Sequence, residues 1–234
     1  MHKYIVEIPA RLGSKRVPKK NLRLINGKPM IAYAIEASIA AKGVERIYIN
    51  SESKILRKLA DEYNIDFFER KPELAKDHIV QDQFNFDFLS NIETENLIMV
   101  NPVSPLVLPS DIENAITYFE DNKLDTLISV REEKLQAFYN GESLNFSTRD
   151  LLPMTQSLRP VQLAAWTVCI WNAEKFKQHY VKNGFAVFVG KYGLYPFDPI
   201  RSLKVSTETD FQLAELYIKS RDNKQIKEKV EYYE

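Results

Sequence analysis

The sequence predicts a single α/β domain built around a mainly parallel β-sheet. Short runs of β-branched and aromatic residues alternate along the chain with longer stretches whose apolar residues recur at helical spacing. Three polar loops, residues 9–21, 50–53 and 101–106, each follow one of the strand-like runs. Strand–helix alternation implies βαβ units with parallel strands, whose carboxyl ends meet at one edge of the sheet. Because ligands bind at that edge in such sheets, we expect the three loops to form a common site.

In the N-terminal half, four predicted strands alternate with three predicted helices. The strands are expected at residues 4–8, 46–50, 65–68 and 97–100, and the helices at 30–41, after 51–53 and at about 80–89. Asn26-Gly27 predicts a turn, Pro29 suits the start of the first helix, and Gly43 suits its end. Residues 51–53 are expected to cap the second helix, which would place Ile55, Leu56, Leu59 and Tyr63 on one face.

The C-terminal half continues the alternation but interrupts it once. A helix is predicted to begin at residues 110–113, strands at 126–130 and 166–171, and helices at 173–180 and 210–220. Residues 132–165 show no sustained period, so we interpret them as an insertion that contacts a second subunit. Residues 221–234 form a charged tail. We therefore expect residues 1–234 to form one domain.

Composition excludes several classes of protein. The chain has 234 residues, 44% of them hydrophobic, which opposes intrinsic disorder. Its 32 basic and 32 acidic residues cancel, which argues against broad nucleic-acid binding. A single cysteine, no signal-peptide pattern and no run of ~20 apolar residues lead us to expect a cytoplasmic protein without a membrane partner. The three histidines have no metal-binding spacing.

The first polar loop, IPARLGSKRVPKKN at residues 8–21, concentrates positive charge in this neutral chain. Arg11, Lys15, Arg16, Lys19 and Lys20 fall within ten residues. Gly13 permits close backbone approach to a ligand, and Pro18 stiffens the exit of the loop. Backbone N–H groups together with Arg and Lys side chains form a site for a polyphosphate, although a solvated surface is the alternative. The loop matches neither the Walker pattern nor G-x-G-x-x-G.

Residues 8–21 closely resemble the signature of acylneuraminate cytidylyltransferases, the CMP-sialic acid synthetases. The resemblance continues through residues 27–36, 70–77, 104–106 and 207–215. It implies the three-layer, Rossmann-like fold of nucleotide-diphospho-sugar transferases, and a homodimer in which the insertion closes the partner's site. It also implies the reaction: the anomeric hydroxyl of a nonulosonic sugar acid attacks the α-phosphate of CTP and releases pyrophosphate.

The resemblance also assigns site residues by motif position. Arg11, Lys15 and Lys20 would be catalytic. Nucleotide binding would involve Ala10, Arg11, Gly13, Ser14, Lys15, Lys20, Asn21, Arg70, Asn101 and Ser104. The sugar acid would contact Arg159, Gln162 and Trp166, and Trp166 adds bulk that could fill a sugar pocket.

The chain departs from the family where a pair of aspartates is expected to hold Mg²⁺. Those positions are Lys204 and Ser206. Three explanations stay open. A register shift of a strand at 202–205 would bring Asp198, Glu208 or Asp210 into the role, with Asp210 a weak substitute. The Lys204 ammonium would otherwise do part of the metal's work, or catalysis is lost. Alternatives to the sialic-acid reaction are therefore another nucleotide or acceptor, or a catalytically silent nucleotide-binding partner subunit.

Overall fold

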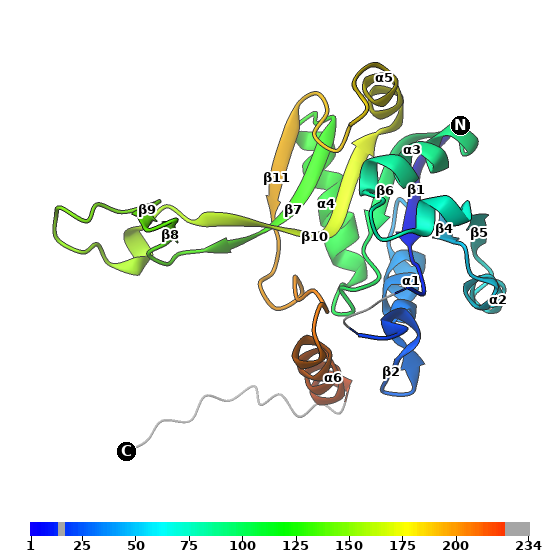
Figure 1. Cartoon of the computed structure of the whole chain (residues 1–234), viewed down its shortest axis with the longest axis horizontal. Coiled ribbons are helices and arrows are strands. Elements are labelled where there is room, and N and C mark those ends of the chain that lie inside the picture. Colours follow the sequence, from blue (N-terminus) through cyan, green and yellow to red (C-terminus); the bar gives the residue numbers. More distant parts are fainter. Residues whose placement is uncertain (14–16, 223–234) are drawn as a thin grey trace.

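The structure is a computed structural model that describes residues 1–13 and 17–222. A seven-stranded sheet forms its centre (Figure 1). The strand order is β11-β7-β10-β6-β1-β4-β5. Its strands are β1 (His2–Pro9), β4 (Arg46–Ser51), β5 (Asp66–Glu69), β6 (Thr94–Val100), β7 (Thr126–Glu133), β10 (Val161–Asn172) and β11 (Tyr192–Pro196). β10 runs antiparallel to β6 and β7, while every other pairing in this sheet is parallel. The predicted mainly parallel sheet is confirmed.

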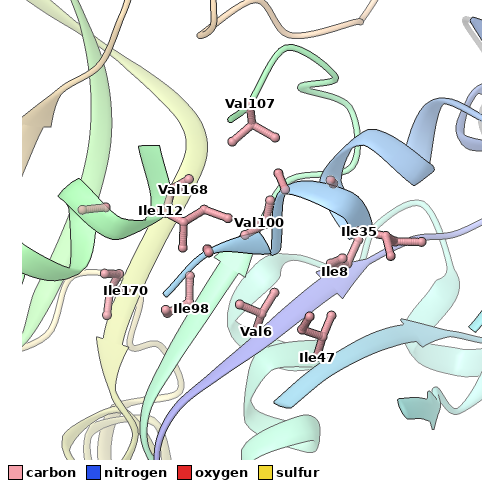
Figure 2. Close-up of a cluster of buried hydrophobic side chains, with 14 of the residues drawn as sticks. Val6, Ile8, Ile35, Ile47, Ile98, Val100, Val107, Ile112, Val168 and Ile170 are labelled. Carbon is pink, nitrogen blue, oxygen red and sulfur yellow. The ribbon is translucent and has the colours of Figure 1, made fainter. Parts of the chain in front are cut away.

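Helices cover both faces of the sheet and make the fold three-layered. The helices are α1 (Met30–Ala40), α2 (Lys54–Glu62), α3 (Gln81–Asn91), α4 (Pro109–Asp121), α5 (Ala173–Asn183) and α6 (Glu208–Asp222). On one face, Ile35 of α1 and Ile112 of α4 pack against alternate strand residues such as Val100 (Figure 2). On the other face, Phe88 of α3 and Phe176 of α5 are fully buried. Strands covered on both faces read as continuous apolar runs, which is why the sequence reveals them.

Two short elements join the basic loop to the first helix. A one-turn 3-10 helix spans Lys20–Leu22, and a small hairpin pairs β2 (Leu24–Ile25) with β3 (Lys28–Pro29). The predicted turn lies between these strands, where Asn26 has φ 49° and Gly27 has φ 81°. Two consecutive left-handed residues are what a tight hairpin turn of this kind requires, and Asn-Gly supplies them at little steric expense.

Most of residues 132–165 lie in an arm that extends from the body of the molecule (Figure 1). Its two legs continue β7 and β10, with Val161 opposite Glu133. The arm also carries a hairpin of β8 (Phe138–Tyr139) and β9 (Glu142–Ser143), and a 3-10 turn at Thr155–Ser157. Another 3-10 turn, Pro72–Ala75, follows β5. In the described part of the chain, no helix is both long and apolar enough to cross a bilayer.

Several local predictions are wrong. Residues 202–205 form a turn and an extended segment rather than a strand, and the Val205 N–H donates to the Val103 carbonyl over 2.8 Å. Ile55 is 55% exposed, because the buried stripe of α2 is formed by Leu56, Leu59 and Ala60. Ser53 precedes α2, but its side chain makes no capping bond to this helix. The last twelve residues of the predicted tail lie outside the described residues.

Candidate functional site

A cavity of about 670 Å³ opens at the carboxyl edge of the sheet, where the sequence predicts a site. The loops after β1, β5 and β6 all contribute to its lining, as do α3, β10 and the segment before α6. Of the predicted nucleotide-binding residues, the cavity brings together Arg11, Gly13, Lys20, Asn21, Arg70 and Asn101. Ser14 and Lys15 lie outside the described residues.

Positive charge dominates the lining of this cavity. Five cationic side chains face it, and they are Arg11, Lys20, Arg70, Lys76 and Lys204. The one carboxylate among the described lining residues is Asp77, whose Oδ1 is 2.7 Å from Arg11 Nη1. Cations gathered in a concave site attract and bind anions, and several of them fit an extended polyanion. The cavity is therefore suited to a ligand that carries phosphate groups.

The basic loop is tied to the neighbouring segments by hydrogen bonds. The Ala10 N–H donates to the Asn50 carbonyl at the end of β4 over 3.0 Å, which buries Ala10 behind the cavity. Lys20 Nζ donates to the Val205 carbonyl over 2.9 Å and thereby joins the loop to the segment before α6. Asn21 is buried, and its Oδ1 atom has no hydrogen-bond partner within the described part of the chain.

Arg70 is held rigidly at the back of the cavity. It is 4% exposed, and its guanidinium donates to Asn50 Oδ1 over 2.8 Å and to the Asn50 carbonyl over 3.1 Å. The Phe84 ring of α3 lies 4.4 Å from the guanidinium and also lines the cavity. Burial lowers the pKa of Arg70, and the nearby charge of Glu7 opposes that effect. An arginine fixed in this way presents its remaining donors without losing side-chain entropy on binding.

Trp166 enters the cavity from a strained position in β10. Its φ of 59° lies in the left-handed region, and the pairing of β10 with β7 changes register between Ala164 and Cys169. A non-glycine residue in this conformation costs about 1–3 kcal/mol, and such residues cluster at functional sites. The indole meets Phe188 edge-on, with ring centroids 6.1 Å apart. The irregularity in β10 therefore turns a large aromatic side chain towards the ligand space.

The other predicted contacts lie outside the lining of the cavity. Arg159 and Gln162 are in the arm, where the Arg159 carbonyl accepts a bond from Asn145 and Gln162 Nε2 donates to Glu132 over 2.9 Å. Ser104 is buried behind Asn101, and its N–H donates to the Asn101 carbonyl over 3.0 Å. The assignments of Arg159 and Gln162 to a sugar acid stay predictions, because neither residue lines the cavity of the same chain.

The acids that a register shift would recruit for a metal have other partners. Asp210 Oδ2 accepts bonds from the Ser206 and Thr207 N–H groups over 2.9 and 2.7 Å, at the start of α6. Glu208 forms a two-pronged ion pair with Arg23. Asp198 accepts bonds from the backbone N–H groups of residues 200 and 201.

The cavity does not contain the donor set that Mg²⁺ prefers. Mg²⁺ is held by carboxylate and phosphate oxygens, yet Lys204 lines the cavity where a carboxylate is expected. In residues 1–13 and 17–222, no three or more His, Cys, Asp or Glu side chains are grouped to hold a metal ion. The described residues therefore do not fit a protein-held Mg²⁺, and phosphate charge in this cavity would be neutralised by lysine and arginine.

Lys76, Gln81 and Phe84 also line the cavity, and none of them is among the site residues that the sequence assigns. Lys76 lies within residues 70–77, a segment that resembles a family motif, and this position was the signal in the sequence that could have identified it as a site residue. Phe84 lies in the helix predicted at about 80–89, where an aromatic residue is typical of a core face, but it lines the cavity and covers Arg70. Periodicity cannot separate a buried helix face from one that forms the wall of a cavity.

Solved structures with the same fold include the CMP:2-keto-3-deoxy-manno-octonic acid synthetase in complex with CTP. It superposes with a TM-score of 0.68 over 94% of this chain and 99% of that chain, at 17% identity. A 4-diphosphocytidyl-2C-methyl-D-erythritol synthase superposes with a TM-score of 0.66 over 93% of this chain and 99% of that chain, at 13% identity. These similarities confirm the predicted nucleotide-diphospho-sugar transferase fold.

Sequence relatives point in the same direction. The N-acylneuraminate cytidylyltransferase of Streptococcus agalactiae is 29% identical over 89% of this chain, which spans 52% of that protein's length. The post-translational flagellin modification protein B of Campylobacter coli is 29% identical over 95% of this chain and 97% of its own length. The profile of the cytidylyltransferase family matches residues 5–197. A match over that length, together with the fold and the basic cavity, establishes that the chain belongs to the cytidylyltransferase family.

Proposed function

We propose that the chain is a cytidylyltransferase that transfers CMP from CTP to a nonulosonic, sialic-acid-like sugar acid and releases pyrophosphate. The observation that carries the proposal is the convergence of five cationic side chains on one cavity at the carboxyl edge of the sheet. Family membership supports the cytidine nucleotide, and the names of the relatives support the sugar acid. The chain spans only about half the length of the streptococcal relative, so the activity of that relative is carried over to this chain as a proposal.

The chemistry requires positioning and charge neutralisation. The anomeric hydroxyl oxygen forms a bond to the α-phosphorus, the bond from that phosphorus to the bridging oxygen breaks, and the hydroxyl proton passes to water. Negative charge that develops on the departing pyrophosphate is neutralised in this proposal by Arg11, Lys20 and Lys204. Asn101 offers an amide to the nucleotide, and Trp166 narrows the cavity on the acceptor side.

The proposal is tested by pyrophosphate release from CTP with a panel of 2-keto sugar acids, with and without Mg²⁺. We expect release that depends on both CTP and one class of acceptor. The same assay with ATP, GTP and UTP examines the alternative that this fold serves a different nucleotide. Absence of release with every nucleotide and acceptor, under both metal conditions, would contradict transfer.

A second candidate is a catalytically silent nucleotide-binding protein that acts as a partner subunit. Lys204 and Ser206 favour it, because they stand where the family resemblance implies metal-holding aspartates. A single ammonium neutralises phosphate oxygens but cannot template an in-line attack as a divalent ion does. Stoichiometric CTP binding without pyrophosphate release would favour this second function over transfer.

We further propose that the arm pairs two copies of the chain. Its apolar side chains are unusually exposed: Leu151 is 91% exposed, Leu152 70% and Phe138 59%. An exposed apolar surface on a thin projection is typical of an interface that a second protein covers. The family resemblance implies that a second copy of this chain is the occupant.

Replacing Leu151 and Leu152 by Ser is expected to convert a dimer into a monomer. The two leucines lose the apolar area that stabilises association, while the body of the fold is untouched. Light scattering should give twice the 27.2 kDa chain mass for the unmodified protein and the chain mass for the variant. Leu216→Ser, an exposed change on α6, is the control and should leave the dimer intact. An unmodified protein that is monomeric would contradict this role of the arm.

A further inference from the structure

A buried polar chain runs behind the cavity from the middle of β1 to Arg70. Glu7 of β1 and Asn50 of β4 lie on adjacent parallel strands, and both side chains are completely buried. The Asn50 amide Nδ2 donates to Glu7 Oε1, and Asn50 Oδ1 in turn accepts from Arg70 Nε over 2.8 Å. Within the described residues, the second oxygen of Glu7 has no hydrogen-bond partner. The chain therefore connects a half-satisfied carboxyl group to a cation that lines the ligand cavity.

Glu7 is not explained by the stability of the fold. It interrupts an otherwise apolar stretch of β1, the strand that lies between β4 and β6, where an apolar side chain would pack against the helices on one face of the sheet. Burial of a carboxyl group without full hydrogen bonding is unfavourable. The charged group that affects the pKa of Glu7 is Arg70. The pKa of Arg70 is affected in turn by the charges of Glu52, Arg11 and Asp87, in addition to that of Glu7. The ionisation of Glu7 therefore depends chiefly on its burial and on the charge of the Arg70 guanidinium at the cavity wall.

We propose that Glu7 is a positioning residue that fixes Arg70 through Asn50 and couples proton uptake to the binding of an anionic nucleotide. The identity of the anion rests on the function proposed above. Asn50 accepts from Arg70 and donates to Glu7, so its amide cannot rotate without breaking the bond at each end. The Phe84 ring closes the other side of the guanidinium. The Arg70 donors that remain are thereby presented to the cavity in one orientation.

The direction of the coupling follows from electrostatics. Burial raises the pKa of Glu7 to about 7, although Arg70 and the hydrogen bond from Asn50 act in the opposite direction. A nucleotide phosphate beside Arg70 brings negative charge towards Glu7 and raises that pKa further. Binding therefore takes up a proton around neutral pH, and the affinity for the anion decreases as the pH rises through this range.

The test compares the wild type with Glu7→Gln, which keeps the shape and the hydrogen bond to Asn50 but cannot ionise. CTP is titrated by calorimetry at pH 6 and pH 8.5, and near pH 7.5 in Hepes and in Tris, whose heats of ionisation differ. The terminal phosphate of CTP also titrates in this range, so the difference between the two proteins isolates Glu7. We expect proton uptake to be smaller in E7Q. We also expect the wild type to lose about tenfold more affinity between pH 6 and 8.5 if binding raises the pKa by one unit.

A matched control removes another buried carboxylate. Asp111→Asn in α4 breaks a 2.9 Å ion pair with Arg201 and should leave the proton uptake and pH profile of CTP binding at wild-type values. Equal proton uptake and parallel pH profiles for wild type and E7Q would overturn the proposal.

Failure of the proposed function is distinguished by the wild type itself. If the wild type binds no CTP, the nucleotide assignment is wrong. The electrostatic coupling between Glu7 and Arg70 can then still be tested in the protein without a ligand. NMR titration of the Glu7 side-chain carboxyl carbon should show a higher pKa in Arg70→Met than in the wild type, because the favourable charge is lost. An unchanged Glu7 pKa in that variant would overturn the coupling.

Discussion

K204D/S206D should weaken CTP binding at least about a hundredfold when divalent metals are chelated. The double change reverses the charge of Lys204, one of five cations among the described lining residues, and adds a second negative charge two residues further along the chain, beside the cavity. At contact distances near a protein surface, each unit charge contributes on the order of 1–4 kcal/mol, and a hundredfold change corresponds to about 3 kcal/mol. Calorimetric titration in the presence of EDTA measures the loss.

Addition of Mg²⁺ should reverse the effect in this variant. Two aspartates restore the carboxylate oxygens that Mg²⁺ prefers, so the affinity of K204D/S206D for CTP should recover when the metal is present. Wild-type affinity should not require the metal, because Lys204 already supplies positive charge at the cavity. Lys182→Asp, an exposed charge reversal on α5, is the control and should bind CTP as the wild type does. Unchanged affinity of the double variant in EDTA would place the phosphates elsewhere.

Glu7→Gln should raise the free energy of unfolding by about 3 kcal/mol at pH 8 and by much less at pH 5. Burial raises the pKa of Glu7 in the folded protein to about 7, from an ordinary value of 4.5. The folded state therefore retains a proton that the unfolded chain releases, and the wild type loses stability as the pH rises from about 4.5 to about 7. Glutamine stays neutral throughout and avoids that loss.

Urea denaturation at pH 5 and pH 8 measures this difference. Asp111→Asn should show the opposite effect and destabilise the protein at pH 8, because it removes the negative charge that pairs with Arg201. A Glu7→Gln protein that is less stable than the wild type at pH 8 would show that the ionised Glu7–Arg70 interaction outweighs the cost of burying the carboxylate. A stability gain combined with a flattened binding profile would identify Glu7 as a residue retained for function.

The elements that the sequence predicts well are those buried on both faces. β1, β4 and β6 are mainly apolar runs, and their residues fill both layers of the core. β11 was missed because Tyr192–Pro196 contains Gly and Pro, which oppose a central strand but suit this edge position. A Cβ atom at Gly193 would lie 2.5 Å from the Leu124 side chain, which would have to move to accommodate it. β10 runs antiparallel to β7 because the two strands are the legs of the arm, and the chain reverses direction within it. No local sequence pattern predicts this reversal.

The candidate site was predictable where one segment carries its own chemistry. The basic loop has its charges and glycine within one short run, so Arg11, Gly13, Lys20 and Asn21 were found from spacing and resemblance. The role of Glu7 could not be predicted, because it depends on Asn50 and Arg70, which lie 43 and 63 positions further along the chain. An acid inside an apolar strand next to a basic loop was the indication available, and only the pairing of β1 with β4 gives it a partner.

We propose that lysine and arginine side chains, rather than a metal ion, hold the phosphates of CTP in this cavity. The most direct measurement is a calorimetric titration of CTP into the wild-type protein at pH 7 with EDTA, repeated with Lys20→Ala. We predict saturable binding of one CTP per chain without metal and a large loss of affinity in the variant. Absence of CTP binding both in EDTA and in Mg²⁺, or equal affinity for CTP in Lys20→Ala and the wild type, would contradict the proposal that the cationic side chains of this cavity bind the triphosphate.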